Sequence, residues 1–430
     1  MALIPAWRVV DAQPGRVVAP DERLPWPQTA ALGVQHVIAM FGATVLAPIL
    51  MGFDPNLAIL MSGVGTLIFF FVVGGRVPSY LGSSFAFIGV VIAATKFAGQ
   101  GANANIAVAL GGIIACGVVV ALIGLIVQMI GTGWIETLMP PVVTGAVVAV
   151  IGLNLAGVPI KNMAHSGFDS WMQAVTFVSV GLVAVFTRGM VQRLLILVGL
   201  IVASLVYAIL TNGMGLGTPI DVSRIASAAW VGMPHFTAPV FEGPAILLIA
   251  PVAVILIAEN LGHVKAVSAM TGAKLDAYMG RAFIGDGLST IVSGAAGGTG
   301  VTTYAENIGV MAATKIYSTA MFVVAALIAI VLGFSPKFGA LIGTIALPVM
   351  GGVSIVVFGL IAIAGAKIWV ENKVDFGDNA NLITAAVTLI LGTGDFTLKF
   401  GDSFTLGGIG TATFGAILLH ALLRRGRTER

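Results

Sequence analysis

The sequence has little charge and a single cysteine. Only 9% of its residues are charged, against roughly 25% in an average soluble domain. One cysteine, Cys116, permits no disulfide within the chain, so cysteine usage does not reveal a redox compartment. Metal-ligand spacings, a nucleotide-binding loop, a Ser/His/Asp hydrolase arrangement and a basic stripe are also missing. We therefore expect no metal, no organic cofactor, no nucleic-acid partner and no enzymatic activity.

What the chain has instead is apolar residues, at 58% of the total, and 56 glycines. Several apolar stretches approach or exceed the ~18 residues needed to cross a bilayer. Small residues let membrane helices approach one another closely. Met1–Trp26 is polar and lacks the apolar core of a cleavable signal, so we expect the first span to direct insertion. The composition predicts an all-α polytopic membrane protein.

We predict fourteen membrane spans from the apolar stretches. They cover residues 29–51, 56–74, 79–97, 105–130, 137–157, 170–187, 191–211, 244–270, 280–296, 300–315, 318–334, 340–365, 379–394 and 405–423. The third and tenth are short and begin with polar or Gly-rich segments. With a cytoplasmic N-terminus, five of the 21 Lys and Arg residues lie outside and sixteen inside, the bias that the positive-inside rule expects. The five outside are Lys96, Lys161, Arg224, Lys337 and Lys399. Both termini are therefore expected in the cytoplasm.

Two segments of the chain are similar without a gap at an offset of 219 residues: SSFAFIGVVIAATK (Ser83–Lys96) and TTYAENIGVMAATK (Thr302–Lys315). Six of their fourteen positions are identical. Further glycine and Pro-Val matches pair predicted spans 2 with 9 and 5 with 12, so the halves hold seven spans each. An odd number of crossings inserts the second half upside down. The sequence therefore predicts a 7+7 inverted repeat, the arrangement of many transporters.

Spans 3 and 10 are expected to be broken helices. Extended backbone at membrane depth is tolerated only where protein buries it or a cavity adjoins it. Two such segments at repeat-related positions can pair as short antiparallel strands. Each is followed by a half-helix that begins near the midplane with free N–H groups, which can meet the oxygen atoms of a ligand.

Three acids fall within predicted spans, and buried charges in membrane proteins usually serve function. Glu259 lies one helical turn before His263 on the same face, and Glu306 begins the second half-helix. A helix cap for Glu306 and a structural buried pair for Glu259 and His263 are the alternatives. Asp286 could equally bond to neighbouring backbone, and we expect a structural or supporting role for His36.

The candidate site offers carboxyl groups, an imidazole, backbone N–H donors and the aromatic faces of Phe85 and Tyr304. No Lys or Arg lies in the core of a span, which disfavours anionic substrates. A small planar ligand with N–H donors and C=O acceptors, such as uracil, fits this set. Desolvation favours the neutral form of a carboxyl group, so the same site could also take up a proton.

Four motifs resemble the nucleobase–ascorbate (nucleobase:cation symporter-2) family. They are ENIGVMAATK (Glu306–Lys315), with the Glu of its uracil members, Gln35–His36, YLGSSFAF (Tyr80–Phe87) and AENLGH (Ala258–His263). The resemblance runs from about residue 20 to residue 423. VVAPDERLPW (Val17–Trp26) resembles the lead of a pyrimidine permease that is encoded with pyrimidine-degradation enzymes.

The resemblance implies a division into core and gate domains. The core would comprise residues 29–130 and 244–334, and the gate residues 131–243 and 335–423. A cytoplasmic segment of residues 1–28 would precede them and a basic tail of residues 424–430 would follow. Family members are often homodimers through the gate, in the inner (plasma) membrane.

The resemblance also implies residue roles. Glu259, Glu306 and the backbone at Phe85 and Ala305 would bind the base, with Tyr304 beside them. Glu259, His263 and Glu306 would handle the proton, and His36 would bond near Ser84. Asn307 and Asp286 would support the site. Ala305 stands where uracil permeases often have Gly, so a methyl group there could narrow the site.

We accordingly expect a proton-coupled symporter that imports uracil by alternating access. Other pyrimidines such as thymine could be further substrates. A purine, xanthine or urate permease is the alternative within the family, and Glu rather than Gln at position 306 argues against it. A nucleobase channel would only equilibrate its substrate, and a membrane enzyme would alter it chemically.

Overall fold

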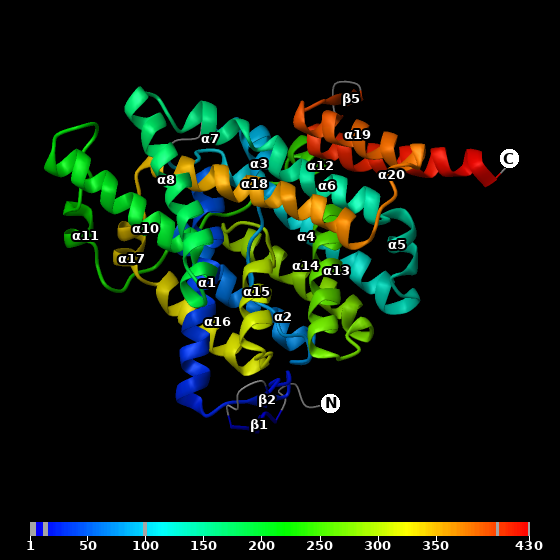
Figure 1. The fold of residues 1–430 in the computed structure, drawn as a ribbon, viewed down its shortest axis with the longest axis horizontal. Coiled ribbons are helices and arrows are strands. Elements are labelled where there is room, and N and C mark those ends of the chain that lie inside the picture. The colour runs from blue at the N-terminus through cyan, green and yellow to red at the C-terminus, as the bar shows by residue number, and fades with distance from the viewer. Residues whose placement is uncertain (1–5, 12–15, 98–100, 401–403, 429–430) are drawn as a thin grey trace.

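The fold is described from a computed structural model, which covers residues 6–11, 16–97, 101–400 and 404–428. Helices dominate it (Figure 1). They are α1 (Trp26–Met51), α2 (Pro55–Val72), α3 (Phe87–Thr95), α4 (Ile106–Ile130), α5 (Gly133–Leu138), α6 (Pro141–Asn154), α7 (Gly157–Asn162), α8 (Gly167–Phe186), α9 (Met190–Arg193), α10 (Leu195–Ala208), α11 (Ser223–Ser227), α12 (Gly243–Ile249), α13 (Val252–Thr271), α14 (Met279–Ala296), α15 (Ala305–Thr314), α16 (Thr319–Gly333), α17 (Pro336–Ile342), α18 (Leu347–Glu371), α19 (Asn379–Thr393) and α20 (Gly408–Thr428).

Short elements complete the chain. A π-helical turn, η1 (Ile209–Gly213), extends α10, and a 3₁₀ turn, η2 (Asp276–Tyr278), precedes α14. The strands are β1 (Arg8–Val9), β2 (Glu22–Arg23), β3 (Leu81–Ser83), β4 (Val301–Thr303), β5 (Leu398–Phe400) and β6 (Phe404–Leu406). They form three separate two-stranded pairs: β1 with β2, β3 with β4, and β5 with β6.

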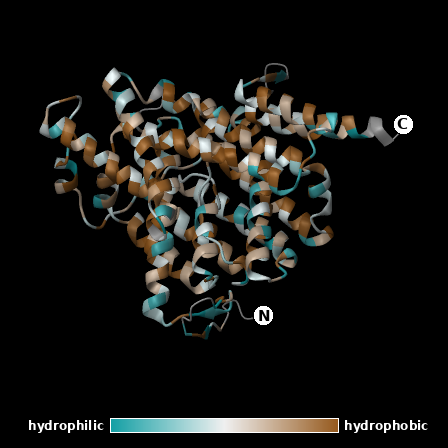
Figure 2. Cartoon of the chain, in the orientation of Figure 1, coloured by the Kyte–Doolittle hydropathy of each residue, from teal (hydrophilic) through white to brown (hydrophobic). Residues whose placement is uncertain are grey.

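Among the described residues, eight helical segments are long and apolar enough to cross a bilayer. They are Trp26–Met51, Pro55–Val72, Ile106–Ile130, Pro141–Lys161, Gly167–Phe186, Leu195–Gly213, Gly243–Thr271 and Leu347–Glu371. The bent pair α16 and α17, at 87°, makes a ninth if it counts as one span. Large apolar side chains also remain exposed along these helices, for example Leu122 on α4 and Val185 on α8, and Figure 2 shows the hydrophobic colour along the helical surfaces. This is the surface of a multi-pass membrane protein, with lipid as its solvent.

Two of the predicted spans differ from the observed helices. Residues 244–270 were expected as one helix, but α12 ends at Ile249 and α13 begins after Pro251, because proline lacks the N–H that would continue the helix. Residues 340–365 were expected as another, but α18 begins only at Leu347, after the short α17 that starts at Pro336. The prediction for residues 244–270 agrees with the single apolar segment Gly243–Thr271 apart from this turn, whereas the start predicted at residue 340 is too early for α18.

The helices pack in two neighbourhoods. α14 packs against α4 and α2, α2 against α16, and α16 against α1, whereas α18 packs against α6 and α8, and α19 joins α6 to α20. Glycine permits the closest of these approaches: a methyl group on Gly117 of α4 would lie 2.8 Å from the carbonyl oxygen of Gly287 on α14. Small residues at such contacts let the backbones of membrane helices meet.

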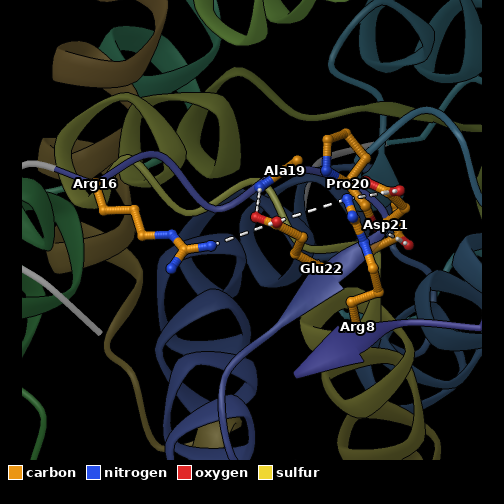
Figure 3. Close-up of polar contacts among 7 residues, drawn as sticks. Arg8, Arg16, Ala19, Pro20, Asp21 and Glu22 are labelled. Carbon is orange, nitrogen blue, oxygen red and sulfur yellow. Dashed lines mark hydrogen bonds and ion pairs between the residues drawn. The ribbon is translucent and has the colours of Figure 1, made fainter. Parts of the chain in front are cut away.

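The N-terminal segment is attached to the helices at the end of α15. Val18 donates its N–H to the Lys315 carbonyl (3.0 Å) and accepts from the Tyr317 N–H (2.9 Å). Within the segment, Glu22 makes ion pairs with Arg8 (3.7 Å) and Arg16 (3.5 Å) and accepts the N–H of Ala19 (Figure 3). The small sheet of β1 and β2 that results was not expected from the sequence.

Candidate functional site

The predicted strand pair between the two halves of the chain is confirmed. β3 and β4 run antiparallel, with Leu81 opposite Thr303, Gly82 opposite Thr302 and Ser83 opposite Val301. All six residues are buried. The backbone polar groups of two extended segments therefore satisfy each other inside the protein, as membrane depth requires.

Each strand leads into a short helix whose start no side chain caps. α3 begins at Phe87 after β3, and α15 begins at Ala305 after β4. Both end at a lysine in the left-handed conformation, Lys96 (φ 54°) and Lys315 (φ 57°), which are equivalent positions in the two similar segments. At α3 the N–H groups of Ala86 and Phe87 bond to Ser84 and that of Ile88 bonds to Phe85. The start of α15 is therefore the one whose N–H groups can best face a ligand.

Threonine hydroxyls of two neighbouring helices bond to the backbones of both strands, which was not predicted from the sequence. Thr66 of α2 accepts the N–H of Leu81 at 2.9 Å, and Thr290 of α14 accepts the N–H of Val301 at 3.2 Å. Each hydroxyl also donates to the carbonyl of the same strand residue. The only signal in the sequence was a threonine in each of the two Gly-rich helices that precede a broken span.

Tyr304 crosses the strand pair. Its hydroxyl donates to the Ser83 carbonyl (2.9 Å) and bonds to Thr44 of α1 (3.1 Å). A methyl group on Gly82 would lie 2.5 Å from the Tyr304 ring, so the ring covers that glycine. The side chain is 4% exposed, which gives Tyr304 a role in the scaffold and leaves Phe85 as the more accessible aromatic ring.

Two carboxyl groups come together beside the start of α15. Glu259 lies on α13 and Glu306 in the first turn of α15, and the two are close enough to interact electrostatically. Both are partly buried, whereas the neighbouring Ala305 is exposed. Phe85 is also partly buried, and its ring meets Phe358 of α18 edge-on, with 6.3 Å between centroids.

His263 is attached to the strand pair rather than to Glu259. Its Nδ1 lies 2.8 Å from Oγ1 of Thr303. The imidazole is partly buried and one helical turn from Glu259 on α13, as the sequence predicted. The bond holds α13 in a fixed position relative to β4.

His36 bonds to Asn307, which corrects the expected bond near Ser84. The Asn307 amide nitrogen lies 3.0 Å from His36 Nδ1 and donates to the His36 carbonyl at 3.0 Å. Because an amide nitrogen only donates, Nδ1 accepts and the ring proton is on Nε2. The Ser84 hydroxyl instead accepts the N–H of Ala86. The His36 ring packs on Phe322, with 4.6 Å between centroids, so His36 links α1, α15 and α16.

Asp286 lies deeper, in the middle of α14, and is completely buried. Its carboxyl interacts with Asn260, Thr302 and Glu259. Within the described ranges, no group of three or more His, Cys, Asp or Glu residues could hold a metal ion. The structure thus brings together Glu259, Glu306, Ala305, Phe85 and His263 near the half-helices, with Tyr304, Ser84, His36, Asn307 and Asp286 around them.

Comparison with known proteins identifies the family of the chain. Residues 27–400 match the family model Xan_ur_permease, whose description is "Permease family". The chain is 70% identical over 409 residues to "Putative pyrimidine permease RutG" of Escherichia coli (strain K12), covering 95% of this chain and 92% of that protein. It is 42% identical over 417 residues to "Uracil permease" of Paenibacillus larvae subsp. larvae, covering 94% and 96%.

The fold also occurs in an anion transporter. The structure of the murine anion transporter Slc26a9 in the inward-facing state superposes with a TM-score of 0.67 at 11% identity, over 93% of this chain and 68% of that one. At this identity the likeness concerns the fold alone. The resemblance to the nucleobase:cation symporter-2 family, and to a pyrimidine permease from the Val17–Trp26 lead, is confirmed. The chain belongs to this permease family and is a transport protein rather than an enzyme.

Proposed function

We propose that the protein imports uracil, and related pyrimidines such as thymine, together with a proton. The observation that carries the proposal is the pair of carboxyl groups, Glu259 and Glu306, beside the uncapped start of α15. Relatives named as uracil and pyrimidine permeases support this choice of substrate. No other cofactor is needed, because the proton is the coupling ion.

The binding mode follows from hydrogen-bond complementarity. Uracil carries ring N–H donors and carbonyl acceptors in one plane. The Glu259 and Glu306 oxygens would accept from the ring N–H groups, and backbone N–H groups at Ala305 and near Phe85 would donate to the carbonyls. The partly exposed ring of Phe85 would cover one face of the base. The exposed position of Ala305 puts its methyl group where the base would approach.

Proton coupling would use the same carboxyl groups. Two ionised carboxylates that interact at close range repel each other, and a proton on one of them removes that repulsion. Binding of a proton and of neutral uracil would then favour each other in one site. His263, one turn from Glu259, would assist the transfer, and its bond to Thr303 would orient the ring.

Transport would require movement of one helix neighbourhood against the other. We place residues 29–130 and 244–334 in a core that holds the site, and residues 131–243 and 335–423 in a gate. The separate packing of α14 with α4 and α2, and of α18 with α6 and α8, supports this division. The Phe85–Phe358 contact would lie on the boundary and change in alternating access.

The remaining architecture is part of the same proposal. Fourteen spans would form a 7+7 inverted repeat, which the antiparallel pairing of β3 with β4 and the matching ends of α3 and α15 support. The protein would lie in the inner membrane, with both termini in the cytoplasm, and form a homodimer through the gate. Cross-linking between gate cysteines introduced into a variant without Cys116 would test the dimer.

Substrate competition tests the proposed function against its rival within the family. Cells without their own uracil permease would express this chain and take up radiolabelled uracil. We expect unlabelled uracil and thymine to compete and xanthine and urate not to compete at the same concentration. Inhibition by xanthine or urate, with none by thymine, would favour a purine permease and overturn the pyrimidine assignment.

A further inference from the structure

A cavity of about 630 Å³ lies beside the junction of α1 and α2. Small-molecule sites in proteins usually measure roughly 300–1,000 Å³. Its walls come from the end of α1, the start of α2, the segments that precede α4 and α12, the end of α14 and the start of α18. Glu259 and Glu306 do not line it, so this cavity is separate from the pair of carboxyl groups.

Hydrogen bonds hold the walls of this cavity in place. Asn103 donates its backbone N–H to the Gly52 carbonyl at 2.9 Å, and its side-chain amide donates to the hydroxyl of Thr95 at 2.9 Å. His235 donates its backbone N–H to Oδ2 of Asp54 at 3.1 Å. The cavity is therefore formed without a ligand, as is usual for small-molecule sites.

The groups that line the cavity suit a neutral, planar ligand. Asp54 caps α2: its Oδ1 accepts the N–H of Asn56 and its Oδ2 that of His235. Each carboxylate oxygen has two lone pairs, so both can accept a further hydrogen bond, and the His235 imidazole can donate one or accept one. Ile106 and Leu347 add apolar surface, and none of the described residues that line the cavity is Lys or Arg. These groups match the ring N–H groups, carbonyls and flat faces of a pyrimidine base better than an anion.

Two helices lead from the cavity to the proposed substrate site. Leu347 begins α18, and Phe358, which meets Phe85, lies about 16 Å further along that helix, at 1.5 Å per residue. Asn103 bonds to Thr95, the last residue of α3, and α3 is the half-helix that follows β3. In the proposed topology α1 ends outside, so the cavity lies on the outer side of the substrate site.

We propose that this cavity is an outer binding site for pyrimidine bases, which uracil occupies on its way to Glu259 and Glu306. The inference rests on the proposed function. A single base is smaller than the ligands that fill cavities of this volume, so the outer site should bind uracil more weakly than the carboxyl pair does. Leu347 belongs to the proposed gate and Asp54 to the core, so movement of one against the other would change the cavity.

Protection of a cysteine from chemical labelling tests the outer site in the purified full chain. Ala102 is exposed and lines the cavity, and it would be replaced in a chain that also carries Cys116→Ala. We expect saturating uracil to slow the reaction of Ala102→Cys with a maleimide several-fold. Ser227→Cys is the matched control, because Ser227 is exposed on α11 and does not line the cavity. Its labelling rate should be the same with and without uracil.

Two further variants separate the outer site from the carboxyl pair. Asp54→Asn preserves the helix cap, because the asparagine oxygen can accept the N–H of Asn56, but it removes the charged acceptor. In the Ala102→Cys chain, Asp54→Asn should abolish protection by uracil and keep the tighter component of radiolabelled uracil binding. Glu306→Gln should do the reverse: it should lose the tighter component and keep the protection.

The outcomes distinguish failure of the outer site from failure of the proposed function. Equal labelling of Ala102→Cys with and without uracil would overturn the outer site. Protection that is lost in Glu306→Gln and kept in Asp54→Asn would overturn it as well, because uracil at the carboxyl pair would then be its cause. Protection in a chain that shows no binding component sensitive to Glu306→Gln would support the outer site and contradict the proposed function.

Discussion

His263 Nδ1 lies 2.8 Å from Thr303 Oγ1, so a side chain of α13 is fixed to the strand that leads into α15. Thr303 is in turn opposite Leu81 in the β3–β4 pair. One hydrogen bond thereby relates the helix that carries Glu259 to the half-helix that carries Glu306. The relative position of the two carboxyl groups depends on it.

Thr303→Val tests this link. Valine keeps the shape of threonine but removes the hydroxyl, which costs about 1 kcal/mol and leaves the His263 ring free to turn. We expect uracil uptake to fall several-fold at limiting substrate. Thr303→Ser, which retains the hydroxyl, is the matched control and should stay close to the unaltered chain. Equal uptake by the valine and serine variants would show that the bond has no part in transport.

Glu259→Gln and Glu306→Gln should each impair uracil accumulation. The substitution keeps the size of the side chain but removes a charged acceptor, and hydrogen bonds to charged groups are worth about 1.5–3 kcal/mol. We expect uracil affinity to fall about 10–100-fold, measured as binding to the purified protein. Normal accumulation by both variants would show that the site is assigned to the wrong residues.

His36→Ala should affect stability more than transport. The substitution removes the ring that packs on Phe322 and one of the two bonds of the buried Asn307 amide, while the bond to the backbone carbonyl remains. We expect a loss of about 1–3 kcal/mol in unfolding free energy and a milder defect in uptake than in Glu306→Gln. His36→Asn, whose amide oxygen can accept a hydrogen bond, should recover part of the stability. A defect in uptake as severe as that of Glu306→Gln, in a chain of normal stability, would place His36 in the site itself.

Two glycines of the broken spans should respond differently to alanine. At Gly82 of β3 the new methyl group would lie 2.5 Å from the Tyr304 ring and 2.7 Å from Thr44 Oγ1, and overpacking of this kind costs about 1–3 kcal/mol. At Gly309 of α15 it would meet nothing within 4 Å, and alanine favours a helix. Thermal unfolding should therefore show a lower midpoint for Gly82→Ala and an equal or higher one for Gly309→Ala. Equal midpoints for the two variants would mean that the ring does not cover Gly82.

Glu136 and Lys265 connect α5 to α13 by an ion pair of 2.8 Å. The hydrogen bond from Lys265 lowers the pKa of Glu136 below its ordinary value of 4.5. The pair should therefore stabilise the fold above about pH 4.5 and lose this effect as the pH falls through the lowered pKa. Both side chains are nearly half exposed, so we expect less than about 1 kcal/mol and less still at high salt. Thermal unfolding of Glu136→Gln at low salt should differ from the unaltered chain at pH 7, and the difference should be smaller at pH 3. A constant difference at both pH values would contradict this account.

The sequence predicted the broken spans because the two similar segments carry extended, Gly-rich starts before apolar helices. Backbone polar groups at membrane depth need hydrogen-bond partners, so the two extended segments were expected to pair with each other. The β3–β4 register agrees with this expectation. The turn at Pro251 and the break between α17 and α18 were missed because the apolar composition continues across them. The β1–β2 sheet was missed because two-residue strands have no periodicity.

The site could be predicted as far as its residue types. Acids in apolar spans stand out, so Glu259 and Glu306 were identifiable without a structure. The partners of polar side chains were not, because they depend on helix rotation: His36 bonds to Asn307, 271 positions away, and His263 to Thr303. The bonds of Thr66 and Thr290 to the two strands were missed for the same reason.

Uphill transport driven by a proton gradient tests the central claim most directly. The purified chain would be reconstituted into vesicles with an acidic exterior, and radiolabelled uracil would be measured inside. We predict accumulation above the outside concentration, collapse of the accumulated uracil on adding a protonophore, and no accumulation with Glu306→Gln. Uracil that only equilibrates, with or without the gradient, would contradict proton-coupled symport and indicate a channel.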